Sequence, residues 1–252
     1  MKKTLSLLSL MMFSALSLNA SLVCYAPMDS ETAGITGGAL TTLVNSTYRD
    51  GGLFGSGASK AGSGQWGISL GSSMDVTNSW SFSFFSYIGN NQASNQWGSA
   101  LIATGNNAYA DSFSNGFQVY LKGETGNGLV VKGGNASGTD ITGTSYARDS
   151  WNHIGLSYSN GVMSVFINGV KATDITTSYN AGASFSQLLN HGAAKATANT
   201  GVKEISLWDQ ALTADQMMLL ATGTSPLNIP EPATASLGAL GLAALFLRRR
   251  RA

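Results

Sequence analysis

Apolar and polar residues alternate along much of the stretch from residue 80 to residue 208, and a period of two predicts β-strands. Both sets of alternating positions are rich in apolar residues, which favours two packed sheets over a single sheet with one wet face. The expected strands cover residues 80–88, 99–104, 116–122, 128–132, 151–159, 162–168 and 202–208.

Four Asn-Gly pairs lie between or beside these strands. They begin at Asn115, Asn127, Asn160 and Asn168. Asn and Gly accept the positive φ angles of two-residue hairpin turns, so most of the strands are expected to be antiparallel neighbours. The clearest hairpin joins strands 151–159 and 162–168 through Asn160-Gly161. Segments rich in Gly and Ser predict loops at 51–64, 89–95 and 133–143.

One short helix is expected after the last strand. Thr213 is a favourable N-cap, and Gln216 three residues later completes a capping box. Gly223 suits the left-handed conformation that ends many helices. The apolar stripe of this helix would be formed by Met217, Leu219 and Leu220.

The first twenty residues have the pattern of a secretory signal peptide. Lys2 and Lys3 precede an apolar run over residues 5–18, and Ala20 supplies a small residue at the expected cleavage site. A permanent membrane anchor is the alternative, but the apolar run is too short to span a bilayer. Residues 1–20 are therefore assigned to a signal peptide, and the protein is expected to be exported.

The last residues, 226–252, form a second targeting segment. Pro230, Glu231 and Pro232 precede an apolar run over 233–247, and the chain then ends in an arginine cluster. The cluster is Arg248, Arg249, Arg250 and Arg251. Fifteen helical residues span about 22 Å, whereas the hydrocarbon core of a bilayer is about 30 Å thick. We therefore expect this transmembrane helix to insert only transiently, with the arginines on the cytoplasmic side.

This tripartite ending resembles the PEP-CTERM sorting signal, with a plain short tail anchor as the alternative. The resemblance implies recognition by an exosortase-type processing enzyme and cleavage near the Pro-Glu-Pro triplet. It also implies delivery to the cell surface, outer envelope or extracellular matrix of a Gram-negative bacterium.

Charge excludes one class of partner. Only 11% of the residues are charged, against about 25% in an average soluble protein. Without the two targeting segments, eight Lys and Arg residues face twelve Asp and Glu residues, a net charge of −4. Nucleic acid is therefore not an expected partner, because its backbone requires a basic surface.

The single cysteine, Cys24, rules out an internal disulfide and a thiolate metal cluster. Lipidation of Cys24 is disfavoured because Val23 stands where a lipoprotein signal has a small residue. A buried thiol is the expected role.

Several motifs resemble laminin-G-like, concanavalin A-like domains. Residues 151–161 (WNHIGLSYSNG) and 165–170 (VFINGV) are similar to the central hairpin of that family. Residues 78–85 (NSWSFSFF) are similar to its aromatic strand, and 202–216 (VKEISLWDQALTADQ) to its final strand and closing helix. The resemblance implies an all-β jelly-roll sandwich over residues 21–225 with one short helix near its end.

Members of the family bind glycans, often with calcium, or bind proteins, and some are glycanases. Glycanases need paired carboxylates, and those of this shape usually carry them close together on one strand. Outside the sorting signal the glutamates are only Glu31, Glu124 and Glu204, and no such strand is evident. Enzymatic activity is therefore not expected.

The sequence gives little indication of a metal site. The family often has an acidic pair before its last strand, which is Lys203-Glu204 here and argues against a metal at that position. Calcium, which binds oxygen ligands in loops, is an open alternative without a defined ligand set. The loop aspartates are Asp29, Asp50, Asp75, Asp111 and Asp140. His153 is expected to pack structurally, and the two histidines lack zinc-ligand spacing.

Trp97 and Tyr109 are the candidate ligand-binding residues, because each lies in a loop beside Asn or Gln and could stack on a sugar ring. The other tryptophans, expected in the core, are Trp66, Trp80, Trp151 and Trp208. The function favoured by this sequence is carbohydrate binding, in the surrounding polysaccharide or on host glycans. The alternative is a structural surface protein acting through protein contacts, and a glycanase is the least favoured.

Overall fold

The computed structural model describes residues 21–30, 34–43, 46–55, 64–89, 99–104, 113–121, 129–136, 138–141, 146–191 and 200–229. The predicted signal peptide and the sorting-signal residues from Pro230 onward lie outside these ranges. In the described ranges, no helix is long and apolar enough to cross a membrane. The fold below is that of the unit Leu22–Ile229.

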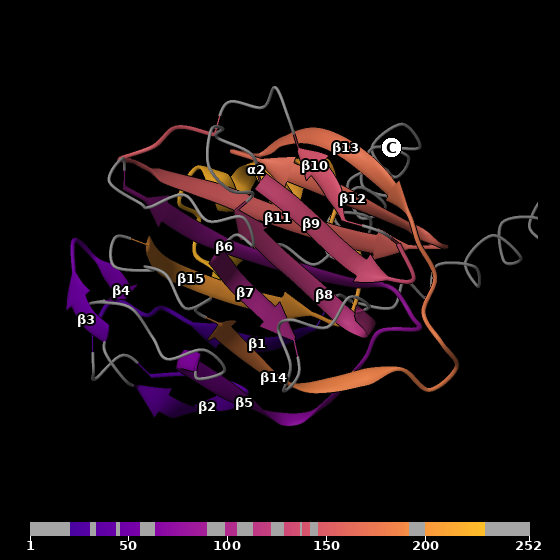
Figure 1. Ribbon diagram of the computed structural model, residues 1–252, viewed down its shortest axis with the longest axis horizontal. Helices are drawn as coiled ribbons and strands as arrows, with labels where there is room; N and C mark the ends of the chain where they lie inside the picture. Colours follow the sequence, from indigo (N-terminus) through magenta and orange to yellow (C-terminus); the bar gives the residue numbers. More distant parts are fainter. Residues whose placement is uncertain are drawn as a thin grey trace, which may run out of the picture. The chain divides into compact units, whose positions relative to one another are not determined.

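Two antiparallel sheets form a sandwich, in agreement with the predicted fold class (Figure 1). Sheet A has the order β13 (Val170–Thr176), β12 (Val162–Ile167), β11 (Trp151–Ser159), β6 (Trp80–Ile88), β15 (Thr200–Trp208), β4 (Gly52–Gly55) and β3 (Ser46–Arg49), with β1 (Leu22–Ala26) also pairing with β15. Sheet B has the order β10 (Thr139–Ile141), β9 (Leu129–Gly134), β8 (Phe113–Leu121), β7 (Ser99–Thr104), β14 (Ser184–His191), β5 (Gly64–Asp75) and β2 (Gly38–Leu43).

Strand β6 supplies the aromatic centre of the core. Trp80, Phe82 and Phe84 alternate along it and are fully buried between the sheets. Phe117 on β8 reaches across from sheet B, with its ring centre 5.1 Å from Trp80 and 4.7 Å from Phe82. Large aromatic side chains bury more apolar surface than any other type, so this row dominates the packing between the sheets.

The predicted hairpin between β11 and β12 is confirmed. Asn160 and Gly161 have φ angles of 51° and 80°, which two-residue turns of this kind require. Asn168 and Gly169, with φ angles of 50° and 79°, make the equivalent turn between β12 and β13. The prediction is wrong for Asn115-Gly116, which lies inside β8. A Cβ at Gly116 would collide with Thr104, so this glycine permits close packing of β8 on β7.

Two of the predicted loops contain strands. The segment 51–64 includes β4, and 133–143 includes the end of β9 and all of β10. The first glycine of β4 fits the packing of its neighbours, because a Cβ at Gly52 would collide with the indole of Trp151. Glycine enrichment marks close packing of rings on this sheet, and it misleads when it is taken only as a loop signal.

The closing helix α2 (Ala214–Ala221) begins and ends as predicted. Gln216 N–H donates to Thr213 Oγ1 at 3.3 Å, and Thr213 N–H donates to Gln216 Oε1 at 2.8 Å. At the other end Gly223 has a φ angle of 90°, and Thr224 N–H donates to the carbonyl of Leu219 at 3.0 Å. The apolar stripe is narrower than expected, since Leu219 is exposed. A 3-10 turn, η1 (Pro226–Asn228), follows the helix.

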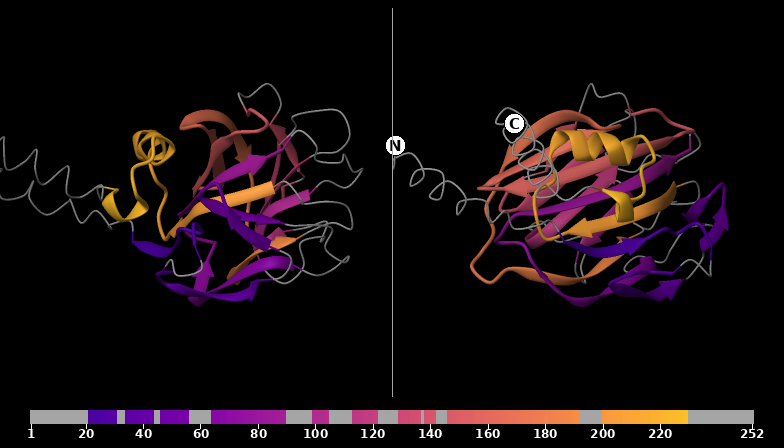
Figure 2. Two further views of the ribbon diagram at one scale, coloured as in Figure 1. Left: turned by 90° about the vertical axis from the view of Figure 1, so that its left-hand side faces the viewer. Right: turned by 180° about the vertical axis from the view of Figure 1, so that it is seen from behind.

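Helix α2 lies on the outer face of sheet A, against β11 and β13 (Figure 2). Buried hydroxyls attach the segment before it to the sheet. Ser157 Oγ donates to the carbonyl of Leu212 at 2.9 Å, and Leu212 N–H donates to Ser81 Oγ at 2.7 Å. The serines that alternate with aromatic residues in β6 are therefore covered, although the sequence pattern alone resembles a solvated face.

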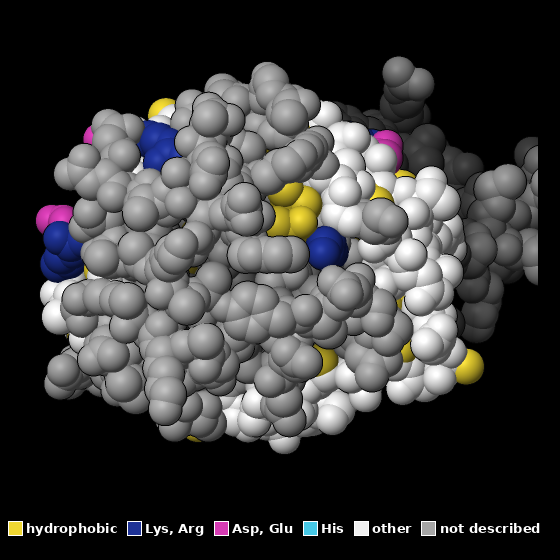
Figure 3. All heavy atoms as spheres, in the orientation of Figure 1, with side chains coloured by type: hydrophobic (Ala, Val, Ile, Leu, Met, Phe, Trp, Pro, Cys, Tyr) yellow, Lys and Arg dark blue, Asp and Glu magenta, His cyan; other side chains and the backbone are white. Residues whose placement is uncertain are grey.

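The face of sheet B carries little charge where its side chains are described. Figure 3 shows few blue and magenta side chains, some of them beside a side chain of opposite sign, and no continuous basic surface among the described residues of that view. This distribution agrees with the low content of charged residues in the whole chain.

The capping box predicts a specific stability effect. Replacing Thr213 with Ala removes the oxygen that accepts from Gln216 N–H, and should lower the free energy of unfolding by about 1 kcal/mol. Thr213→Ser keeps the oxygen and should stay near wild type. Chemical denaturation of the three purified proteins measures this difference. Equal stabilities for the Ala and Ser variants would show that the cap contributes nothing.

Candidate functional site

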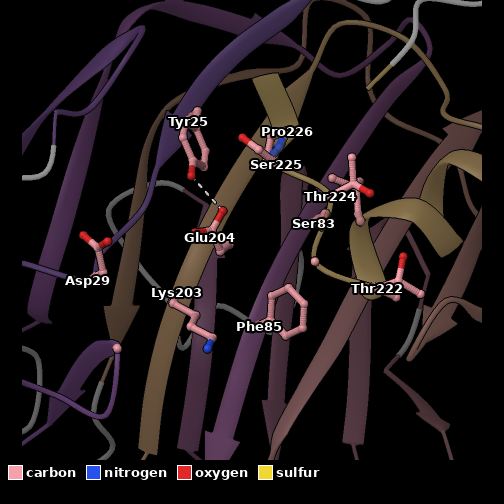
Figure 4. Close-up of a pocket in the computed structure, with 14 residues that line it drawn as sticks. Tyr25, Asp29, Ser83, Phe85, Lys203, Glu204, Thr222, Thr224, Ser225 and Pro226 are labelled. Atoms are coloured by element: carbon pink, nitrogen blue, oxygen red, sulfur yellow. Dashed lines mark hydrogen bonds between the residues drawn. The ribbon is translucent and has the colours of Figure 1, made fainter. Parts of the chain in front are cut away.

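A hollow of about 530 Å³ opens on the outer face of sheet A, beside the end of α2 (Figure 4). Strands β6 and β15 form its floor, and the segment that follows α2 forms one wall. The side opposite that wall comes from β1 and the residues after it. Its lining consists of Tyr25, Asp29, Gly51, Ser83, Phe85, Lys203, Glu204 and residues 220–226.

A β-bulge in β15 creates the charged part of the floor. The pairing of β15 with β6 shifts register between Lys203 and Ser206, and Glu204 has a φ angle of 53°. The N–H of Glu204 donates to the carbonyl of Pro27 at 2.9 Å, which holds the bulge in place. Adjacent residues of a regular strand point to opposite faces, whereas this bulge lets Lys203 and Glu204 both line the hollow.

Glu204 is held by a tyrosine from the first strand. Tyr25 Oη donates to Glu204 Oε2 at 2.7 Å. Burial, and then the hydrogen bond to Glu204 and its negative charge, raise the pKa of Tyr25 well above its ordinary value. Tyr25 therefore stays protonated and keeps the carboxylate directed toward β1, as Figure 4 shows.

Lys203 lies on aromatic rings. Its Nζ is 4.4 Å from the ring centre of Trp151 and 5.7 Å from that of Phe85. Phe85 is directly opposite Lys203 in the sheet, and both side chains are half-buried. These contacts are cation–π interactions, which stabilise an ammonium without a negatively charged partner.

The expectation that Trp151 belongs to the core is wrong. Trp151 is half-buried on the outer face of sheet A, where its ring lies over Gly52 and 5.5 Å from the ring of Phe54. Trp80 and Trp208 are buried as predicted, and the side chain of Trp66 lies outside the described part of the chain. Trp151 is the first residue of β11, and its place in the alternation of that strand directs its side chain away from sheet B.

His153 and Ser83 form a buried pair at the edge of the hollow. Ser83 Oγ and His153 Nε2 share a hydrogen bond of 2.7 Å, and burial lowers the pKa of His153 to about 4. The backbone N–H of His153 donates to Asn168 Oδ1 at 2.9 Å, so the asparagine of the second turn fixes this part of β11. The ring is fully buried and Ser83 is 2% exposed, which fits the packing role expected for His153.

The sequence-predicted ligand residues Trp97 and Tyr109 lie outside the described residues, so the structure does not test their role. Of the loop aspartates, Asp29 lines the hollow and Asp50 is exposed in the turn before β4. Asp75 accepts hydrogen bonds from Thr77 and then Asn78, and those from Thr77 lower its pKa most.

Asp111 and the side chain of Asp140 lie outside the part of the chain that the structure describes. Within the described ranges, no three His, Cys, Asp or Glu side chains gather as a metal site. Calcium stays a prediction without a ligand set. Cys24 is fully buried, as expected for a structural thiol, and burial raises its pKa to about 11.

The hollow was missed at the sequence level because its parts are far apart in the chain. It combines the first strand, β6, the bulge of β15 and the segment after α2. The available signal was Lys203-Glu204, the pair that stands where the similar domains often have two acids. A second signal was the alternation of the last strand itself. Its core residues Val202, Ile205 and Leu207 are separated by three and then by two positions, and a step of three breaks the period of two as an inserted bulge residue does.

Comparison with known families identifies the domain. A family model described as the concanavalin A-like lectin/glucanases superfamily matches residues 48–218. The chain belongs to this superfamily. A second model, the PEP-CTERM protein-sorting motif, matches residues 228–251 and indicates export, exosortase processing and surface association in Gram-negative bacteria. No curated protein matches the chain.

Solved structures of the same fold include receptor-binding regions of toxins. The binding domain of Paraclostridial Mosquitocidal Protein 1 superposes with a TM-score of 0.60 at 13% identity, over 79% of this chain and 51% of that one. The binding domain of botulinum neurotoxin DC in complex with SialylT gives 0.58 at 15% identity, over 82% and 52%.

Botulinum neurotoxin type C, whose cell entry is described as dependent upon interaction with two ganglioside molecules, gives a TM-score of 0.57 at 15% identity, over 81% of this chain and 51% of that one. This chain therefore spans about half the length of these structures. At such low identity the likeness shows the superfamily fold alone.

The buried His153 predicts a pH dependence of stability. Its pKa falls from 6.5 in the unfolded chain to about 4 in the folded protein, so the unfolded chain takes up the proton first. The contribution of neutral, buried His153 to the free energy of unfolding is fully present above pH 6.5. It decreases by about 3 kcal/mol as the pH falls toward 4. The free energy of unfolding of wild type and His153→Gln, measured between pH 7 and 4, checks this. An equally steep loss in the variant would show that other groups cause the effect.

Proposed function

We propose that this protein is a non-catalytic binding protein of the bacterial surface or matrix, and that it holds a carbohydrate in the hollow on sheet A. The observation that carries this proposal is the combination of a half-exposed aromatic ring, Phe85, with hydrogen-bonding side chains around it. A pyranose has an apolar face and a rim of hydroxyls, and such a site matches both. The cavity volume of about 530 Å³ also lies in the range of small-ligand pockets.

The polar groups of the hollow offer both donors and acceptors. Tyr25 occupies Oε2 of Glu204, and Oε1 has no partner among the described residues, so it is free to accept from a sugar hydroxyl. Asp29 supplies another acceptor from the side of the hollow opposite the segment after α2. Hydroxyl groups come from the segment after α2, at Thr222, Thr224 and Ser225.

Two further observations support the proposal indirectly. The sorting motif directs the protein toward the bacterial surface, which is rich in polysaccharide. Two botulinum neurotoxin structures of the same fold are described as dependent upon interaction with gangliosides or as in complex with SialylT. That support is analogy, since one fold hosts many functions. The loop pair Trp97 and Tyr109, with or without calcium, stays a second candidate for the binding site.

A broad glycan array tests the proposal, probed with the purified protein first with calcium and then with chelator. Selective binding is expected. Glu204→Gln should weaken it about tenfold, because a hydrogen bond to a charged group contributes about 1.5–3 kcal/mol. Asp174→Asn is the matched control, since Asp174 is an exposed acid on β13 that pairs with Lys171 outside the hollow.

The other outcomes of this experiment separate the alternatives. Binding that is lost in Trp97→Ala or Tyr109→Ala, but kept in Glu204→Gln, would move the site to the loops. Loss in chelator would establish a calcium-dependent site. The absence of binding by a folded protein would overturn the proposal and favour the structural surface protein. Because Asp29 and Glu204 are both carboxylates in the hollow, bound glycans should also be checked for cleavage, which would indicate a glycanase.

A further inference from the structure

Lys203 is the cation of the hollow, and the structure leaves its charge available. Its described contacts are the rings of Trp151 and Phe85. Among the described residues, no carboxylate lies within ion-pair distance of its Nζ. An ammonium held on aromatic faces is partly removed from water, which strengthens its attraction for an incoming anion.

The neighbouring acid does not neutralise this charge. Lys203 and Glu204 are adjacent in sequence and opposite in charge, yet the bulge and Tyr25 keep them apart. The Glu204 carboxylate points toward Tyr25, whereas the Lys203 ammonium points toward Phe85 (Figure 4). The hollow therefore has an acidic end lined by hydroxyls and a cationic end lined by an aromatic ring.

The rings that hold Lys203 are fixed by the sheet beneath them. Trp151 lies over Gly52, where any larger residue would collide with its indole. Phe54 lies over Gly201, with ring atoms 2.7 Å from where a Cβ would be, and its ring meets Trp151 edge to face. Two glycines on adjacent strands therefore make room for the aromatic support, which places the ammonium at a defined position.

We propose that the hollow is selective for an acidic sugar, whose carboxylate pairs with Lys203 while its ring lies against Phe85 and its hydroxyls bond at the Glu204 end. This inference rests on the proposed carbohydrate binding and specifies the class of ligand. The domain between the targeting segments has a net charge of −4, which would disfavour an acidic polymer at long range. Selectivity for such a ligand therefore requires a local cation, and Lys203 provides one.

The test compares a polyuronate with its neutral counterpart. Purified protein is titrated with polygalacturonate, with the same polymer after reduction of its carboxyl groups, and with sialyllactose. The reduced polymer keeps the sugar backbone and lacks the charge. Sialyllactose distinguishes a carboxylate on a terminal sugar from one repeated along a chain. Binding of the polyuronate is expected to be at least about tenfold tighter than binding of the reduced polymer, and to weaken as salt is raised.

Two substitutions assign the selectivity to Lys203. Lys203→Met keeps a long apolar side chain on the rings and removes the charge, and should reduce the preference for the acidic polymer over the reduced polymer about tenfold. Lys203→Arg keeps the charge and should retain the preference. Lys171→Met is the matched control, because Lys171 is an exposed lysine on β13 paired with Asp174 at 2.6 Å. Thermal unfolding of each variant confirms that it is folded.

The possible failures of the two proposals differ. Equal binding of acidic and reduced polymers, or an unchanged preference in Lys203→Met, would overturn the inference while carbohydrate binding stands. If the protein binds neither these ligands nor any glycan of the array, both proposals fail together.

Discussion

The rest of the structure depends on strand β6, which is buried along its inner face and over the first part of its outer face. One face carries Trp80, Phe82 and Phe84 into the centre of the sandwich. The other carries Ser81, which accepts a hydrogen bond from Leu212 N–H in the segment before α2, and then Phe85 in the lining of the hollow. Because the aromatic face fixes β6 against sheet B, the outer face is a rigid support. The floor of the hollow is therefore built on a firmly packed strand, although loop residues complete its walls.

Strain at one position of β15 gives this support its chemistry. A residue other than glycine at positive φ costs about 1 kcal/mol or more, and Glu204 adopts this conformation. The carbonyl of Pro27 and the hydroxyl of Tyr25, both from the first segment of the domain, hold the glutamate in that position. The beginning and the end of the fold thus meet at the bulge. Pairing of β1 with β15 is consequently a requirement of the site as well as of the sheet.

Features set by local chemistry could be predicted from the sequence, and features set by distant neighbours could not. The turn at Asn160-Gly161 and the cap at Thr213 depend on adjacent residues, and both were predicted. Asp50 and Gly51 have φ angles of 51° and 69° and turn β3 into β4, so the same local rule could have found this hairpin. Glycine content argued for a loop there, whereas the glycine of β4 is needed by Trp151, a residue about a hundred positions away.

The candidate site was the part hardest to predict from the sequence. Its position depends on which face of each strand is covered and on which segment of the chain covers it. An opening tryptophan in β11 is easily assigned to the core, yet Trp151 points outward and supports Lys203. Two acids at positions 203 and 204 could share a cation, whereas a lysine and a glutamate cannot. The substitution that disfavours a metal therefore also places a positive charge in the hollow. Lys203 therefore argues against a bound metal ion in the hollow and favours an acidic sugar.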